Sequence, residues 1–123
     1  DSNDIGSVVQ SAIEYADVIY IPTDNTMAQN TEAINNIALP AGVPIIAGEE
    51  GICSGCGVAT LSISYYDIGY KAGEMAYDIL VNGADITTMN VESAPQVTKE
   101  YNKDICDQLG ITIPDDYTAI ETN

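Results

Sequence analysis

Two short apolar runs, each preceded by an amphipathic segment, constrain the fold of this sequence more than any other feature. Val18–Ile21 is a β-branched and aromatic run that Pro22 ends, and Val43–Ala47 is a second run of the same character. Such runs are typical of buried strands. Apolar residues recur at helical spacing over residues 4–15 and again over residues 27–38. Because helix, strand, helix and strand alternate with short turns, we predict an α/β fold with parallel strands.

Helix caps and turn residues support these boundaries. Ser2 and Asn3 precede the first predicted helix, and either Asn25 or Thr26 is expected to cap the second. The second helix is expected to end near Pro40–Gly42.

A third predicted strand, over residues 58–64, is polar on one side. Alternate positions carry Thr and Ser on that side and aliphatic side chains on the other. A long helix is expected over residues 65–81, ended by Asn82–Gly83. Its apolar stripe consists of Ile68, Ala72, Met75, Ala76, Ile79 and Leu80.

The last part of the chain predicts shorter elements. Residues 84–96 are rich in turn-forming and polar types and indicate a connector. Residues 97–101 predict a strand, residues 104–109 a short helix that Gly110 closes, and residues 111–113 a final extended piece before an acidic tail.

The charge of the chain excludes several functions. The 123 residues include 19 Asp or Glu, 3 Lys, no Arg and no His, giving a formal net charge of -16. So few cations cannot neutralise a phosphate backbone or favour an anionic membrane surface, so we expect no nucleic-acid partner. Histidine-based catalysis and histidine zinc sites are excluded, and we expect no cofactor and no catalytic residue. Phe and Trp are absent, so the core must be aliphatic.

The three cysteines carry a weaker signal. Cys53 and Cys56 have CxxC spacing within a glycine-rich stretch that we predict to be a loop, and Cys106 is far away in sequence. A redox CxxC usually lies where a strand turns into a helix, and a structural zinc site needs four ligands. We therefore favour a local loop disulfide or two ordinary thiols over a redox or metal role.

Three segments are expected to meet at the carboxyl ends of the strands, where ligands bind in open parallel sheets. Thr23, Asp24 and Asn25 follow the first strand. Glu49 and Glu50 follow the second, and Ser64 and Tyr65 follow the third. Taken singly, these residues are better explained as helix caps, a solvated turn and packing side chains.

Taken together, the same residues favour a ligand that carries an ammonium group. Carboxylate, amide and hydroxyl groups gather there without a cation. Asp24 or one of the two Glu side chains is expected to pair with the ammonium, and the helix amides at residues 25–27 to receive a carboxylate. Tyrosine rings are available to stack on the body of the ligand.

Four segments, residues 16–26, 42–51, 59–73 and 102–114, closely resemble a family of bacterial ABC-transporter substrate-binding proteins. The best-known related subgroup takes up tryptophan and tyrosine. The resemblance implies a type I periplasmic-binding fold, in which two lobes with Rossmann-like parallel sheets flanked by helices close on a small ligand and present it to a membrane permease. It also implies an extracellular or periplasmic location and a lipoprotein anchor in the full-length protein.

The resemblance further implies that this chain is a C-terminal fragment, and the sequence begins with Asp1 and has no initiator Met. Residues 1–64 would belong to the second lobe, residues 65–96 would form a crossover helix and connector packed on the first lobe, and residues 97–123 would form the terminal strand, short helix and tail. Without the first lobe, we expect the helix over residues 65–81 to bury its stripe by swapping or self-association, or to refold locally.

Two other functions fit an acidic α/β chain. The first is a receiver-like or hydrolase-like enzyme in which Asp24, Glu49 and Glu50 hold Mg²⁺ for phosphoryl chemistry. Such a site needs a nearby cation, and the three lysines lie far along the chain from these residues. The second is the effector-binding domain of a transcription regulator, which would require a basic DNA-binding segment.

Overall fold

The structure is a computed structural model that describes residues 2–94 and 96–121. The chain forms two compact units. The first unit comprises Asp1–Ser62 and Lys99–Asn123, and the second comprises Ile63–Thr98. We describe each unit by itself.

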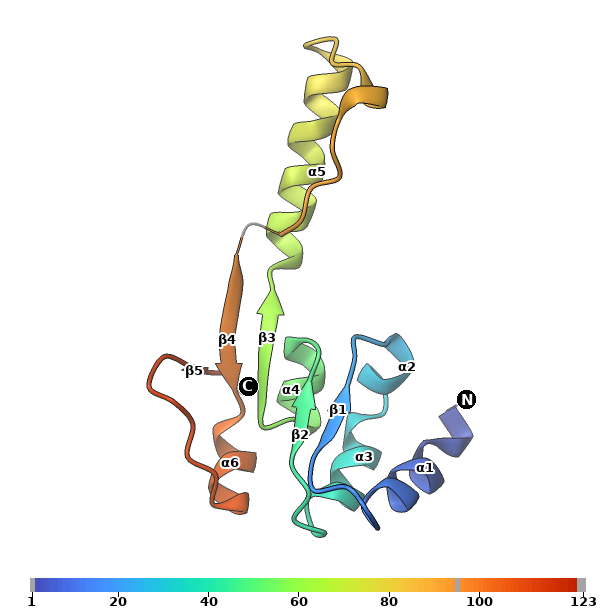
Figure 1. The fold of residues 1–123 in the computed structure, drawn as a ribbon, viewed down its shortest axis with the longest axis vertical. Helices are drawn as coiled ribbons and strands as arrows, with labels where there is room; N and C mark the ends of the chain where they lie inside the picture. The colour runs from blue at the N-terminus through green and yellow to red at the C-terminus, as the bar shows by residue number, and fades with distance from the viewer. Residues whose placement is uncertain (1, 95, 122–123) are drawn as a thin grey trace. The chain divides into compact units, whose positions relative to one another are not determined.

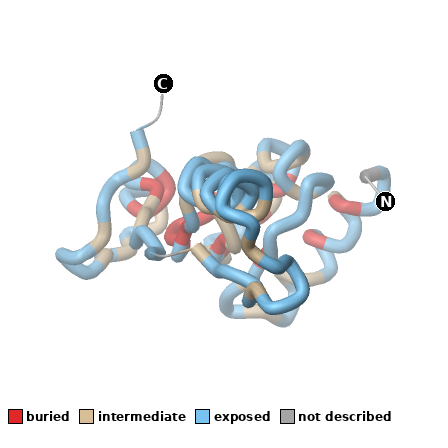
Figure 2. Tube along the Cα trace, turned by 90° about the horizontal axis from the view of Figure 1, so that it is seen from above, coloured by how far each residue is buried: buried red, intermediate tan, exposed pale blue. Residues whose placement is uncertain are grey.

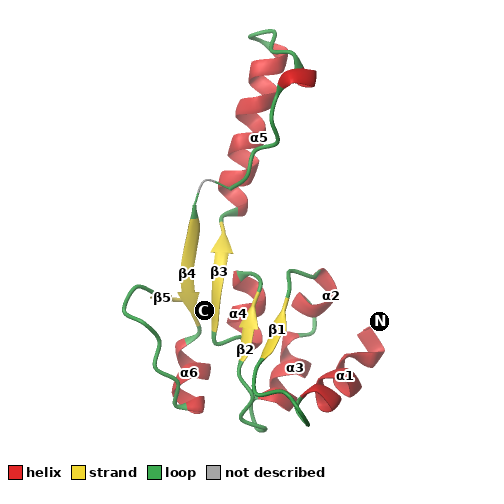
Figure 3. Cartoon of the chain, in the orientation of Figure 1, coloured by secondary structure: helices red, strands yellow, loops and turns green. Residues whose placement is uncertain are grey.

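The first unit holds most of the regular structure (Figures 1 and 3). Its helices are α1, α2, α3, α4 and α6, after a short 3₁₀ turn over Ser2–Asp4. The helices span Ile5–Ala12, Asn25–Ala28, Thr31–Ala38, Glu50–Cys56 and Lys103–Leu109. The strands β1, β2 and β5 span Ile19–Ile21, Ile45–Ala47 and Thr118–Ala119, while β3 (Ala59–Ile63) and β4 (Val97–Tyr101) cross the division between the units.

The strands form one sheet in the order β1-β2-β3-β4-β5. The pairs β1–β2, β2–β3 and β4–β5 are parallel, and β4 runs in the opposite direction to β3 in Figure 1. Parallel pairing needs a crossover between strands, and α2, α3 and α4 lie in the two crossovers from β1 to β3. The predicted α/β class and mostly parallel sheet are confirmed.

Two apolar clusters form the core of the first unit. The larger joins α1, α3 and α4 to one face of β1 and β2, and it is aliphatic except for two cysteines. Its fully buried members include Ile34, Ile45 and Ile52. The smaller joins the start of β3 to α6 through Val58, Ala59, Ile105 and Cys106. The expectation of an aliphatic core is confirmed.

Strand β3 turns its hydroxyl side inward. Thr60 and Ser62 are 2% and 5% exposed, whereas Leu61 between them is 54% exposed. The alternation was predicted, and Thr60 shares the inner face of the sheet with its register partner Ala47. The polar side of this strand is therefore the buried one.

Two predictions about helices were wrong. The single helix over residues 27–38 is two helices, α2 and α3, because the chain turns at Gln29 and Asn30. The predicted glycine-rich loop around the CxxC is the helix α4, because the side chain of Glu49 caps its first turn and offsets the low helix propensity of glycine.

The second unit consists of α5 (Tyr65–Leu80), a short 3₁₀ helix η2 (Ile86–Thr88) and the chain that leads into β4. The predicted helix and connector are confirmed, and Gly83 ends the helix region with a φ of 72°. None of the described residues of this unit is buried, as the colours of Figure 2 show for α5. Within the described residues, no helix combines the length and apolar character that crossing a bilayer requires.

Candidate functional site

Two hydrogen bonds join the ends of β1 and β2 and the loops that follow them. The hydroxyl of Thr23 donates a hydrogen bond to the carbonyl oxygen of Gly48 at 3.1 Å, and the Gly48 N–H donates to the carbonyl of Ile21 at 2.8 Å. A Cβ atom at position 48 would lie 2.6 Å from the backbone nitrogen of Thr23. Only glycine permits this approach, which brings the Thr23–Asn25 loop beside the Glu49–Glu50 loop.

Asp24 is the N-cap of α2. Its Oδ1 atom accepts the Met27 N–H at 2.9 Å, and its extended backbone is that of a capping residue. Asn25 is the exposed first residue of the helix and not its cap, and its contact with a ligand stays a prediction. Of the helix amides at residues 25–27 that were expected to receive a ligand carboxylate, the Met27 amide is already bonded to Asp24.

Glu49 has the same role at α4. Its carboxylate accepts the Gly51 N–H at 2.9 Å and also the N–H of Ile52. The positive end of the helix dipole also stabilises a carboxylate at this position. Glu50 is exposed at the first position of the helix and leaves its carboxylate to solvent.

Ser64 and Tyr65 belong to the second unit, unlike the other five predicted site residues. The Ser64 hydroxyl caps α5 by accepting the Asp67 N–H at 3.1 Å. Tyr65 begins the helix and is 61% exposed.

A hollow of about 320 Å³ lies between the start of α1 and α2. Asp24, Thr26 and Met27 line it from α2, and Ile5 and Val8 are among the residues that line it from α1. This volume is within the range of small-molecule sites. Sequence reasoning did not identify the α1 side, because residues on the apolar face of a helix were assigned wholly to the core.

A second polar group of the first unit was also missed. Oε2 of Glu100, on β4, and Oγ1 of Thr60 are buried without a hydrogen-bond partner among the described atoms. Burial raises the pKa of Glu100, the nearby Glu50 raises it further, and a hydrogen bond from Ser62 opposes both effects. The polar side of the strand predicted over residues 58–64 indicated buried polar groups, but the sequence pattern does not link that strand to Glu100.

The three lysines are all paired with other carboxylates. Lys71 lies 3.6 Å from Glu74, Lys99 pairs with Asp116, and Lys103 pairs with Asp107. The lysines therefore leave the carboxylates at the ends of β1 and β2 unneutralised. Among the described residues, no three Asp, Glu, His or Cys side chains gather as metal ligands.

The cysteines are buried thiols, so the predicted loop disulfide is wrong and the alternative of ordinary thiols describes the structure. Burial raises the pKa of Cys53 to about 12, with a smaller contribution from Cys106, and burial raises the pKa of Cys56 to about 11. A reactive cysteine needs a lowered pKa and access to solvent. Neither condition holds for this pair.

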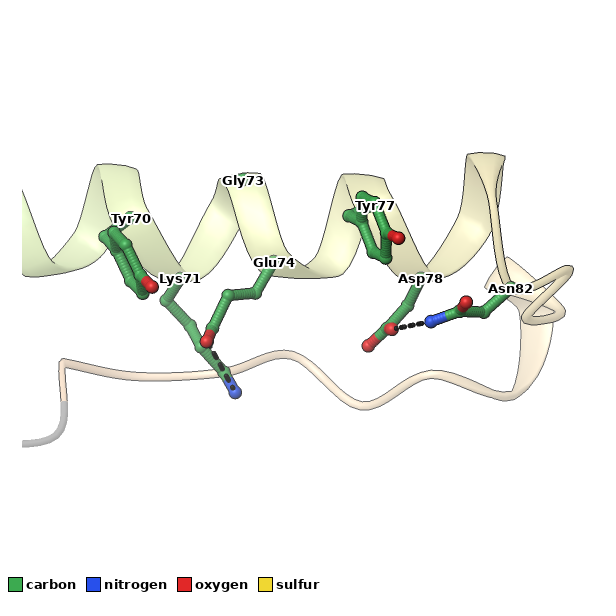
Figure 4. Close-up of a pocket in the computed structure, with 7 residues that line it drawn as sticks. All are labelled: Tyr70, Lys71, Gly73, Glu74, Tyr77, Asp78 and Asn82. Carbon is green, nitrogen blue, oxygen red and sulfur yellow. Dashed lines mark hydrogen bonds and ion pairs between the residues drawn. The ribbon is translucent and has the colours of Figure 1, made fainter.

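The second unit carries a groove of its own along α5 (Figure 4). Tyr70 and Tyr77 flank Gly73, which has open space where a Cβ would lie. Asp78 accepts a hydrogen bond from the Asn82 side chain at 2.8 Å at one end of the groove. The groove has a volume of about 620 Å³, and its rings lie on an exposed helix face.

The chain is similar to proteins of known type over most of its length. Residues 1–122 match the family described as ABC transporter substrate binding protein. A tyrosine-binding protein of Clostridioides difficile is 34% identical over 93 residues, which are 72% of this chain and 27% of that protein.

Three solved structures share the fold. A ligand-free, open substrate-binding protein with adhesive properties from Clostridium difficile is 33% identical, with a TM-score of 0.78 over all of this chain and 42% of its own. A conserved domain protein from Vibrio cholerae is 31% identical, with a TM-score of 0.82 over 97% of this chain and 41% of its own. An ABC domain in complex with L-Trp from Streptococcus pneumoniae is 29% identical, with a TM-score of 0.80 over 94% of this chain and 39% of its own. This chain thus spans about a quarter of the curated relative and about two-fifths of each solved chain.

Proposed function

This chain belongs to the family of ABC-transporter substrate-binding proteins, and we propose from that membership that it is part of the solute-binding component of an ABC importer. The whole protein would capture a small ligand between two lobes and deliver it to a membrane permease. Such a protein binds without catalysis and works outside the membrane, and we propose a lipoprotein anchor for it. The match of the family over residues 1–122 carries this proposal.

The proposed ligand is an amino acid, and an aromatic one. A tyrosine-binding protein and a structure that holds L-Trp are among the relatives of this chain. The unneutralised carboxylates at the ends of β1 and β2 suit an ammonium group, and they add independent chemical support.

The proposed ligand contacts are those that follow the strands: Thr23, Asp24, Asn25, Glu49, Glu50, Ser64 and Tyr65. These residues differ in whether their polar groups are already engaged in hydrogen bonds within the chain. Asp24 and Glu49 already hold helix amides, so they would position their loops, whereas Asn25 and Glu50 are exposed and free to meet a ligand from their own loops.

The test is a thermal-shift screen of the twenty amino acids on the full-length protein. We expect stabilisation by tyrosine or tryptophan, because binding to the native state alone raises its stability by mass action. Asp24→Asn is the informative variant, because it removes the charge but keeps a capping oxygen, whereas Asp24→Ala removes both. No shift with any amino acid would sink the amino-acid assignment, and a shift that depends on Mg²⁺ alone would favour an enzyme.

A further inference from the structure

One face of the sheet formed by β1, β2 and β3 carries exposed apolar side chains. Tyr20 and Ile46 are register partners in β1 and β2, and they are 65% and 38% exposed. Leu61 on β3 is 54% exposed. It shares their face because it lies two residues after Ala59, the register partner of Ile46. We call the surface formed by Tyr20, Ile46 and Leu61 the outer face.

The opposite face of the same strands is covered. Ile21, Ile45 and Ala47 are buried there in the larger core cluster, against α1, α3 and α4. On the outer side, Ala59 at the start of β3 is buried with α6, and the side chains of the outer face stay exposed. Parallel sheets occur almost only in proteins that cover both of their faces. The outer face therefore lacks a covering layer in the described part of the chain.

The order of the strands explains why α1 to α4 do not supply this layer. From β1 to β2 to β3, the chain advances in one direction along the sheet. Crossovers between parallel strands are right-handed, so connections that advance in one direction place their helices on the same face. A helix reaches the other face through a connection that runs in the opposite direction, as in doubly wound sheets. In this unit, the place for such a connection is the free edge of β1.

The free edge of β1 is suited to pairing with another strand (Figure 1). The Ile19 N–H donates to the Pro44 carbonyl at 3.0 Å, and the Ile21 carbonyl accepts the Gly48 N–H at 2.8 Å, so these groups face β2. Backbone groups of alternate residues point to opposite edges of a strand, so those of Tyr20 point away from β2. Natural edge strands are usually protected by charged residues or proline, and β1 contains neither.

We propose that a strand and a helix from the part of the full-length protein outside residues 1–123 complete this sheet. The strand pairs in parallel with β1, and the helix that leaves it packs an apolar stripe on the outer face. The length of the related chains supports this occupant. The three solved relatives match 94%, 97% and 100% of this chain, but the match spans only 39%, 41% and 42% of their own chains. The inference goes beyond the proposed function and does not depend on the ligand.

The first experiment tests the free edge by amide hydrogen exchange of the full-length wild-type protein, followed by NMR. The Tyr20 amide reports on the edge of β1, and the Ile46 amide in the interior strand β2 is the reference. We expect the two amides to exchange within about 30-fold of each other, because both would lie inside the completed sheet. Faster exchange of Tyr20 than this would show that β1 remains an edge strand and would overturn the proposal.

The second experiment tests the outer face by alkylation of the full-length Leu61→Cys variant with N-ethylmaleimide. Tyr15→Cys, at a residue of the first unit that is 80% exposed, is the matched control. Peptide mass spectrometry measures the ratio of the labelling rates in denaturant and in the native state for each introduced thiol. We expect this ratio to be at least about 10 times larger at position 61 than at position 15, because the helix covers position 61. A smaller difference would mean that the outer face stays open in the whole protein.

Both measurements are repeated after dilution, because a second copy could also cover the outer face. Protection that is independent of protein concentration supports a covering segment within the same protein. Protection that falls on dilution would assign the outer face to a second copy and overturn the proposal. Neither experiment contains a ligand, so failure of this inference leaves the proposed function standing, and failure to bind any amino acid leaves this inference standing.

Discussion

Asp24 has one role that the structure shows and one that we propose. Its carboxylate accepts a hydrogen bond from the Met27 N–H at 2.9 Å and so caps the helix, whereas its contact with the ligand is the proposed role. We expect Asp24→Ala to lower the free energy of unfolding by about 1 kcal/mol and Asp24→Asn to leave it nearly unchanged, because Asn caps as well as Asp. Chemical denaturation of both variants checks this, and equal losses would show that charge, not capping, is what matters.

The buried thiols lead to a second prediction at this scale. Because burial raises the pKa of both Cys53 and Cys56, we expect alkylation by N-ethylmaleimide to be slow in the native protein and fast in denaturant. Mass spectrometry after timed quenching measures the labelling. Rapid labelling of the native protein would contradict the burial of these residues. Ser7→Cys, which places a thiol at an exposed position, is the control for an accessible cysteine.

Glu100 gives a pH dependence. Its carboxyl keeps its proton to a higher pH in the native state than the ordinary value of 4.5, because of burial and the neighbouring Glu50. The free energy of unfolding therefore falls as pH rises from that value through the raised native pKa, because the native state binds more protons there. Thermal unfolding as a function of pH should show Glu100→Gln more stable than the wild type above this window, with the difference lost below it.

At the level of elements, Asn102 links two helices. It is 3% exposed, and its Oδ1 accepts the Ile105 N–H to cap α6 while its Nδ2 donates to the carbonyl of Ser54 in α4 at 2.7 Å. One side chain thus satisfies groups of two elements that lie far apart in the sequence. Nothing in the sequence around Asn102 indicates the second contact, because it depends on where α4 packs.

We expect Asn102→Ala to cost about 1–3 kcal/mol of stability, because it leaves buried backbone groups without partners. Asn102→Ser is the matched variant, since Ser keeps a capping oxygen and loses the donor to α4 without burying a charge. Urea titration should therefore place Ser between Ala and the wild type. An Ala variant as stable as the wild type would rule out the link between the helices.

Helix α5 has a face that its own unit leaves open. Tyr66 and Tyr70 stack with ring centroids 6.3 Å apart, and Tyr77 and Leu80 continue the same exposed side. Of the predicted apolar stripe, Ile68, Ala72 and Met75 line a hollow with the returning chain near Ala94, whereas Leu80 lies on the exposed side. The helix was predicted correctly, but the chain that returns along it could not be paired with it from the sequence alone.

At the scale of the whole molecule, we propose that the 123-residue chain self-associates through α5, and sedimentation velocity tests this. We expect Tyr70→Glu to shift the distribution toward the monomer, because it places a charge within the exposed ring pair. Val91→Glu, at a residue that is 97% exposed outside α5, is the matched control for added charge. Association should strengthen with salt, because the net charge of -16 opposes it. A monomer at all concentrations would contradict the proposal.

The sequence by itself determined the α/β class, the alternation of helices and strands up to the third strand except for α4, and the aliphatic core. These depend on periodicity and on side-chain chemistry, both of which are local. It also determined the family, through matching segments along nearly the whole chain. Tertiary structure decided what the polar residues do. Whether Thr60 faces the core or solvent, and which backbone groups of α4 the Asn102 side chain satisfies, depend on contacts between residues distant in sequence. Burial then sets the cost of each unpaired polar atom, which a linear pattern does not contain.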